Sequence, residues 1–132
     1  MKKARELFYI FTIGAVGYSL LEILWRKYTH WTMAITGGIC FLLIYRINIK
    51  LKLKHMVSKC VLGALAITMV EFLVGWVVNV KLKWNVWDYS SRSFNLLGQV
   101  CALYSFLWFL LCIPLNFLCN AIHKHFFLKK EI

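Results

Sequence analysis

Four long apolar runs constrain the fold of this chain more than any other feature of its sequence. They cover roughly residues 7–25, 31–49, 57–80 and 94–119. A helix that spans the hydrocarbon core of a membrane needs about 20 mainly apolar residues, so the first, third and fourth runs qualify directly. The second run reaches that length if it continues to Ile49, with the Arg46 side chain extending back to the interface.

The hydrophobic content excludes an ordinary soluble domain. Of the 132 residues, 61% are hydrophobic, and a soluble fold of this length has too little interior to bury them. Strands are disfavoured within the runs, because lipid offers no partner for their backbone groups and no barrel-like alternation is present. The first run is too long for a cleaved signal peptide and contains Glu22. We therefore predict an all-α integral membrane protein, a single domain (1–132) with four transmembrane helices.

The positive charges indicate how the helices are oriented. The net charge is +11, and 11 of the 16 Lys and Arg residues lie before the first run, in the 46–59 segment that joins the second and third runs, or after the fourth. The positive-inside rule then places both termini and the 46–59 segment in the cytoplasm. This distribution indicates membrane topology and no nucleic-acid partner. We expect a multi-pass protein of the bacterial cytoplasmic (inner) membrane.

An internal similarity relates the two halves of the chain. GAVGYSLLEIL (14–24) and GALAITMVEFL (63–73) share Gly, Ala, Glu and Leu at the same offsets, and a weaker echo links GGIC (37–40) with GQVC (98–101). The first and third helices run in the same direction, so the repeat would be parallel. We predict two related helical hairpins, with Glu22 and Glu71 at equal depth in the membrane.

A short polar segment, WNVWDYSSRSFNLLGQ (84–99), separates the last two apolar runs. At about 1.5 Å per residue, Glu22 lies about 22 Å beyond the start of its run and Glu71 about 21 Å beyond the start of its own. Both carboxyls therefore fall at the outer level of the membrane, beside this segment. The predicted ligand-binding cluster combines Glu22, Glu71, Arg26, Asp88, Tyr89, Arg92, Asn95 and Gln99.

Structural roles remain open for the same residues. The two glutamates could bind Arg26, Tyr18 or helix-end amides and serve only to hold helices together. Asp88 could cap a turn, and Asn95 could cap a fourth helix that starts at residue 94. Trp84 and Trp87 are expected to be interfacial anchors.

The cysteines and histidines indicate no metal site, disulfide or cofactor. The five cysteines have no C-x-x-C pairing, and all five lie inside apolar runs, where cysteine behaves as a small hydrophobic residue. His123 and His125 belong to a basic tail and are expected to be solvated.

The segment after Asn85 resembles a bacterial membrane-protein family named "Putative ABC-transporter type IV". That family carries W-D-Y-S, N-[LI]-x-G and C-L-x-x-S-x-x-W in this order. The first two motifs occur here at 87–90 and 95–98, and the third corresponds to Cys101-Ala102-Leu103 followed by Ser105 and Trp108. The family's glutamates in the first and third helices correspond to Glu22 and Glu71, and the resemblance covers roughly residues 10–118. Many members have a G-P-x-x-P-I-Y-G-like stretch in the second helix that this chain lacks, which is typical of a compact branch.

Three function classes follow. The resemblance and the acidic cluster favour a transporter or a solute-binding, permease-like subunit, acting as a homo-oligomer or with a membrane partner subunit in the lipid bilayer. The alternative is a structural or regulatory membrane protein that docks another membrane component. An enzyme is disfavoured, because no Ser/His or Cys/His nucleophile arrangement is present. The chain has no G-x-x-x-x-G-K-[ST] loop, so it is not the ATPase.

Overall fold

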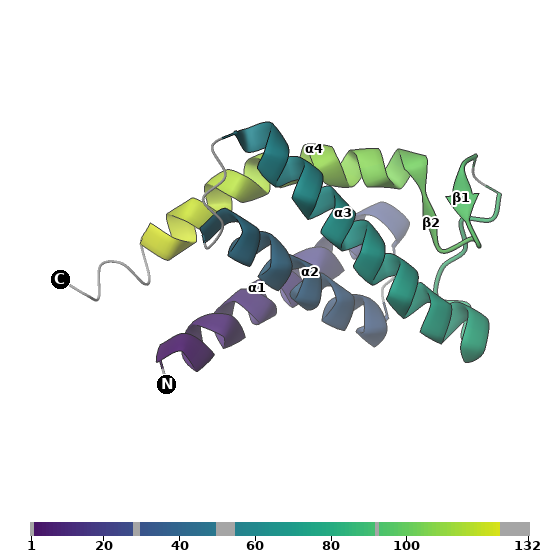
Figure 1. Cartoon of the computed structure of the whole chain (residues 1–132). Helices are drawn as coiled ribbons and strands as arrows, with labels where there is room; N and C mark the ends of the chain where they lie inside the picture. Colours follow the sequence, from purple (N-terminus) through teal and green to yellow (C-terminus); the bar gives the residue numbers. More distant parts are fainter. Residues whose placement is uncertain (1, 28–29, 50–54, 92, 125–132) are drawn as a thin grey trace.

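The computed structural model describes residues 2–27, 30–49, 55–91 and 93–124. Its helices are α1 (Lys2–Arg26), α2 (Trp31–Ile49), α3 (Met56–Gly75), the π-helical η1 (Trp76–Lys81) and α4 (Ala102–Ile122), with two short strands, β1 (Asn95–Leu96) and β2 (Val100–Cys101), before α4 (Figure 1). Four helical segments in the described residues are long and apolar enough to cross a membrane: Ala4–Trp25, Trp31–Ile49, Met56–Lys81 and Ala102–Ile122. The predicted all-α membrane architecture is confirmed at this level.

The surface of the helices is that of a membrane protein. Phe8, Leu24, Leu65 and Phe117 are each more than half exposed, and they belong to three different helices. In water, apolar surface on this scale would cause aggregation. In a bilayer these side chains face lipid, which is as apolar as they are.

Helix α2 occupies the centre of the packing. It packs against α1 and also contacts α3 and α4, and more than half of its span is buried inside the protein. Small residues allow the close approach of α1 and α2: a Cβ atom on Gly14 would lie 2.8 Å from the Gly37 carbonyl oxygen. Helix α3 packs on α4, where the Thr68 and Ser105 hydroxyls form a hydrogen bond of 2.8 Å. Close packing at small residues replaces the hydrophobic effect, which is absent between helices in lipid.

The fourth helix begins at Ala102, so the predicted start at residue 94 is wrong. Residues 95–101 instead form a small antiparallel hairpin in which Asn95 pairs with Cys101 and Leu96 with Val100. Leu97 (φ 54°) and Gly98 (φ +73°) adopt left-handed conformations at its turn, which no α-helix accommodates. The predicted role of Asn95 as the cap of the fourth helix is therefore wrong as well, because the N-cap is Cys101.

The hairpin also limits the internal similarity. Residues 37–40 lie inside α2, whereas residues 98–101 form a turn and a strand, so the weaker sequence echo has no structural counterpart. The relation between the 14–24 and 63–73 segments, both helical, stays a prediction. So does the placement of the termini in the cytoplasm.

Candidate functional site

A polar scaffold holds the loop between η1 and α4 in a fixed conformation. The Asn79 side chain of η1 lies at its centre: its Oδ1 accepts the Val86 N–H at 2.6 Å and the Trp87 N–H at 3.3 Å, and its amide donates to Gln99 Oε1 at 2.9 Å. The Trp87 indole N–H donates to the Gln99 carbonyl at 2.9 Å, and the Gln99 amide donates to the Leu97 carbonyl at 2.8 Å. These bonds satisfy polar groups in a buried setting, where an unmade bond costs about 1–3 kcal/mol.

The W-D-Y-S residues are fastened to the N-x-x-G turn. The Tyr89 N–H donates to the Gly98 carbonyl at 2.7 Å, and the Gly98 N–H donates to Asn95 Oδ1 at 2.9 Å. Gly98 is required here for two reasons: its φ is positive, and a Cβ would lie 3.0 Å from Asp88 Oδ1. The two sequence signatures therefore form one structural unit.

Two cavities lie beneath this loop. The first, which we name the loop chamber, has a volume of about 560 Å³ and lies between the loop, α1 and α4. Its polar lining residues include Glu22, Asp88, Tyr89, Ser91 and Tyr104. The second, which we name the α1–α4 cavity, has a volume of about 290 Å³, is lined by residues of all four long helices and has a mainly apolar lining. Four residues line both cavities: Tyr18, Leu21, Trp108 and Leu111.

Glu71 lies where the two cavities meet. Its side chain is 5% exposed and lines the α1–α4 cavity. The Trp108 indole N–H donates a short hydrogen bond to Glu71 Oε1, and the Tyr89 hydroxyl is a second hydrogen-bond partner. A buried carboxyl in a membrane helix costs about 3 kcal/mol near the bilayer centre, so donors of this kind are expected beside it.

Glu22 belongs to the same electrostatic environment. The Tyr18 hydroxyl hydrogen-bonds to Glu22, and the two glutamates are close enough to interact with each other through their charges. Glu22 lines the loop chamber and Glu71 lines the α1–α4 cavity. Their equal depth in the membrane stays a prediction.

A chain of aromatic rings lines the junction of the cavities. Tyr89 stacks on Tyr104 with ring centroids 4.8 Å apart, Tyr104 lies 6.4 Å from Trp108, and Trp108 contacts Tyr18 edge-on at 6.1 Å. These rings come from the loop, α4 and α1. Among them, only Tyr89 was predicted as a site residue, because the rotation of a helix about its axis cannot be read from composition alone.

The remaining predicted site residues have other placements. Asn95 and Gln99 lie in the loop scaffold and are not among the residues that line either cavity. Trp87 is buried, whereas Trp84 is exposed and contacts Trp31, as an interfacial residue would. Arg92 and the side chain of Arg26 lie outside the described residues.

The pKa values of two loop side chains, Asp88 and Tyr89, differ from their usual values. Hydrogen bonds from Ser90, including its N–H at 2.9 Å from Asp88 Oδ1, lower the pKa of Asp88 below its usual value. Asp88 therefore contributes a negative charge to the loop chamber at neutral pH. Burial, reinforced by the charge of Glu71, raises the pKa of Tyr89, so its hydroxyl stays protonated and able to donate.

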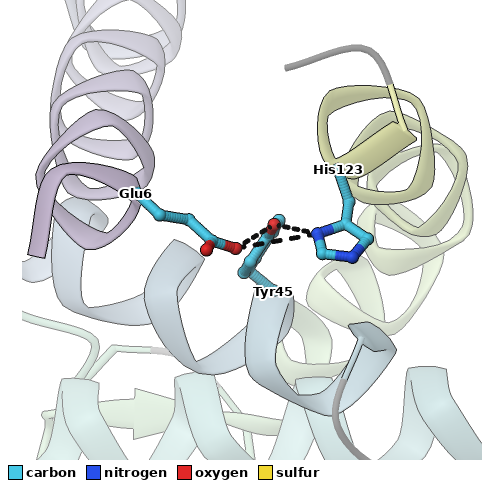
Figure 2. A network of polar contacts seen from close by, with 3 residues as sticks. All are labelled: Glu6, Tyr45 and His123. Atoms are coloured by element: carbon cyan, nitrogen blue, oxygen red, sulfur yellow. Dashed lines mark hydrogen bonds and ion pairs between the residues drawn. The ribbon is translucent and has the colours of Figure 1, made fainter. Parts of the chain in front are cut away.

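A second polar network, missed at the level of sequence, lies at the opposite end of the helices. The Tyr45 hydroxyl of α2 donates to Glu6 Oε1 of α1 at 2.6 Å, and His123 Nδ1, just after α4, lies 2.7 Å from the same hydroxyl (Figure 2). His123 Nδ1 also lies 3.6 Å from Glu6 Oε1, so each of the three side chains contacts the other two. The network joins α1, α2 and the end of α4.

The described residues contain no group of three or more His, Cys, Asp and Glu side chains that could hold a metal ion. All five cysteines are buried and free.

Comparison with known proteins gives one result. The family model described as "Putative ABC-transporter type IV" matches residues 7–131. No curated protein and no solved structure matches the chain.

Proposed function

The chain belongs to the "Putative ABC-transporter type IV" family of membrane proteins, and from this premise we propose that it binds and moves a small solute, as a transporter or a permease-like subunit. The site of binding is the junction of the loop chamber and the α1–α4 cavity. The protein acts in the bacterial cytoplasmic membrane with both termini inside, as a homo-oligomer or beside a membrane partner subunit.

The position of Glu71 carries this proposal. An ionisable side chain in a membrane helix is costly, and such residues mark solute or ion pathways more often than packing sites. Glu71 is buried, yet it lines a cavity, and its known partners Trp108 and Tyr89 are neutral donors. A purely structural carboxyl would be expected in a filled interface.

The lining residues that the two cavities share support the proposed passage of a solute. The loop chamber has a polar lining beneath the W-D-Y-S segment, and it shares Tyr18, Leu21, Trp108 and Leu111 with the α1–α4 cavity. We propose that a solute in the chamber reaches Glu71 by passing the shared residues Tyr18 and Trp108. The Glu6–Tyr45–His123 network lies outside both cavity linings, at the other end of the same helices.

Native mass spectrometry of gently solubilised protein tests the proposal. Three proteins are compared: the wild type, Glu71→Gln, and Glu6→Gln as a matched control at the opposite end. Gln keeps an acceptor for the Trp108 indole, so the fold should survive. We expect a bound small molecule in the wild type and in Glu6→Gln, and its loss in Glu71→Gln.

A bare chain in all three proteins, or a chain that carries only a protein partner, would contradict the proposal. That result would favour the alternative in which the protein docks another membrane component. Glu71 would then be a structural residue and the W-D-Y-S loop a structural cap.

A further inference from the structure

The α1–α4 cavity has a chemical character that narrows the class of ligand. Of its lining residues, Thr36 and Glu71 carry strongly polar groups, and the remainder are apolar, aromatic or small. The Thr36 hydroxyl already donates to the Thr32 carbonyl at 2.7 Å. Glu71 is thus the one carboxyl among the described lining residues, and the body of a ligand there contacts apolar surface.

The charges around the cavity favour a cation. Glu71 lines the α1–α4 cavity, and Glu22 and Asp88 line the adjoining loop chamber. No Lys, Arg or His occurs among the described residues that line either space. An anion would therefore meet three carboxyls with no described basic side chain in the linings to offset them.

The aromatic residues favour an organic cation in particular. Trp108 and Tyr18 line both spaces, and their ring centroids lie 6.1 Å apart. Aromatic faces attract ammonium groups that have been removed from water. A bare metal ion instead needs several oxygen ligands at short range, and the described residues gather no such set.

We propose that the α1–α4 cavity binds an organic cation with an apolar body, such as a quaternary or tertiary amine. The ammonium group lies against Glu71 and the Trp108 and Tyr18 rings, and the apolar body lies between α1 and α4. This inference rests on the proposed function, because it names the ligand class of the same site.

A substitution at Gly17 tests whether the ligand occupies the α1–α4 cavity. Gly17 lines the cavity, and a Cβ placed on it would meet no atom within 4 Å. We therefore expect Gly17→Leu to place its larger side chain in the cavity, since its Cβ meets no neighbouring atom. Val16→Leu is the matched control, because Val16 is exposed on the same helix and lies outside both linings.

The experiment measures binding of two probes of similar size and opposite charge to the purified full chain in nanodiscs. The probes are benzyltrimethylammonium and phenylmethanesulfonate, and the readout is the fluorescence of the chain's tryptophans. We expect saturable binding of the ammonium and none of the sulfonate. Loss of the Glu71 charge in Glu71→Gln should weaken ammonium binding by about tenfold or more. Gly17→Leu should weaken it similarly, and Val16→Leu should leave it unchanged.

Three results would overturn the inference. They are equal binding of both probes, ammonium binding that Glu71→Gln leaves unchanged, and a cavity occupied by a copurified phospholipid that the ammonium does not displace. If native mass spectrometry finds a Glu71-dependent ligand while the ammonium fails to bind, the ligand class is wrong and the proposed function stands. If neither probe nor any native ligand depends on Glu71, both proposals fail. Circular dichroism and size-exclusion profiles identify variants that have lost their fold. If Glu71→Gln does not fold, Glu71→Asp replaces it. Weaker ammonium binding is then expected, because the shorter side chain withdraws the carboxylate from the cavity.

Discussion

Two glycines in one turn of α1 should respond in opposite ways to the same substitution. In Gly14→Ala the new Cβ would lie 2.8 Å from the Gly37 carbonyl oxygen and 3.2 Å from Gly38 Cα. Both are backbone atoms of α2, so neither can rotate away. In Gly17→Ala the new Cβ meets no atom within 4 Å. The comparison therefore separates a packing glycine from a cavity glycine at nearly the same depth.

The magnitude follows from these distances. The Gly14→Ala methyl is about 0.6 Å short of an ordinary contact with the Gly37 oxygen, so α1 and α2 must move apart and lose dispersion contacts along their interface. Overpacking of this kind costs about 1–3 kcal/mol. Gly17→Ala should change the free energy of unfolding by between zero and a gain of about 1 kcal/mol, because Ala favours the helix over Gly.

Reversible unfolding in mixed micelles, followed by the fluorescence of the chain's six tryptophans, measures both values. Wild-type stability in Gly14→Ala, or equal destabilisation in Gly14→Ala and Gly17→Ala, would contradict this prediction. Either result would mean that α1 and α2 do not approach each other closely at Gly14.

Three further predictions concern the two ends of the molecule. Tyr45→Phe removes the hydrogen bonds to Glu6 and His123 and should lower the free energy of unfolding by about 1–3 kcal/mol in the same assay, whereas an unchanged stability would mean that the network does not form. Asn79→Ala leaves two loop N–H groups without their acceptor and should speed their hydrogen exchange by at least about tenfold, with α2 amides as the internal control. The pKa of Asp88 is lowered from its usual 3.8, so the contribution of Asp88 to loop stability is complete above pH 3.8 and is lost only as the pH falls through the lowered pKa. A loop amide signal in an NMR titration that changes near pH 5 would contradict this prediction.

The sequence was sufficient to predict the four spans, because hydrophobicity over about 20 residues directly reflects a physical requirement of the bilayer. It did not predict the start of α4. Within residues 94–101, Phe94, Leu96 and Leu97 are as apolar as the residues of a membrane helix. Hydrophobicity alone does not distinguish a helix from a short hairpin. The N-x-x-G spacing contained the missing signal, since an Asn side chain that binds the N–H of a following left-handed Gly forms a turn.

The sequence predicted some residues of the candidate site and missed others. Counting residues along two helices predicted that Glu22 and Glu71 lie near the polar loop; Glu22 and loop residues line the loop chamber, and Glu71 lines the α1–α4 cavity. Which side of α4 faces those cavities depends on the packing of α2 and α3, so Trp108 and Tyr104 could not be identified from the sequence. Gln99 was expected beside the glutamates, yet the scaffold centred on Asn79 engages both ends of its amide.

Cysteine accessibility at two adjacent positions of α4 tests most directly whether solute reaches Glu71 through the loop chamber. Leu111 lines both cavities, whereas Leu110 is 43% exposed on the helix surface and belongs to neither lining. Each is replaced by Cys in nanodiscs and treated with a water-soluble cationic methanethiosulfonate, with the wild type giving the background of the native cysteines. If the account is correct, Leu111→Cys reacts and Leu110→Cys, which faces lipid, does not. Reaction at Leu110→Cys with none at Leu111→Cys would show that the junction is closed to water and would contradict the proposed pathway.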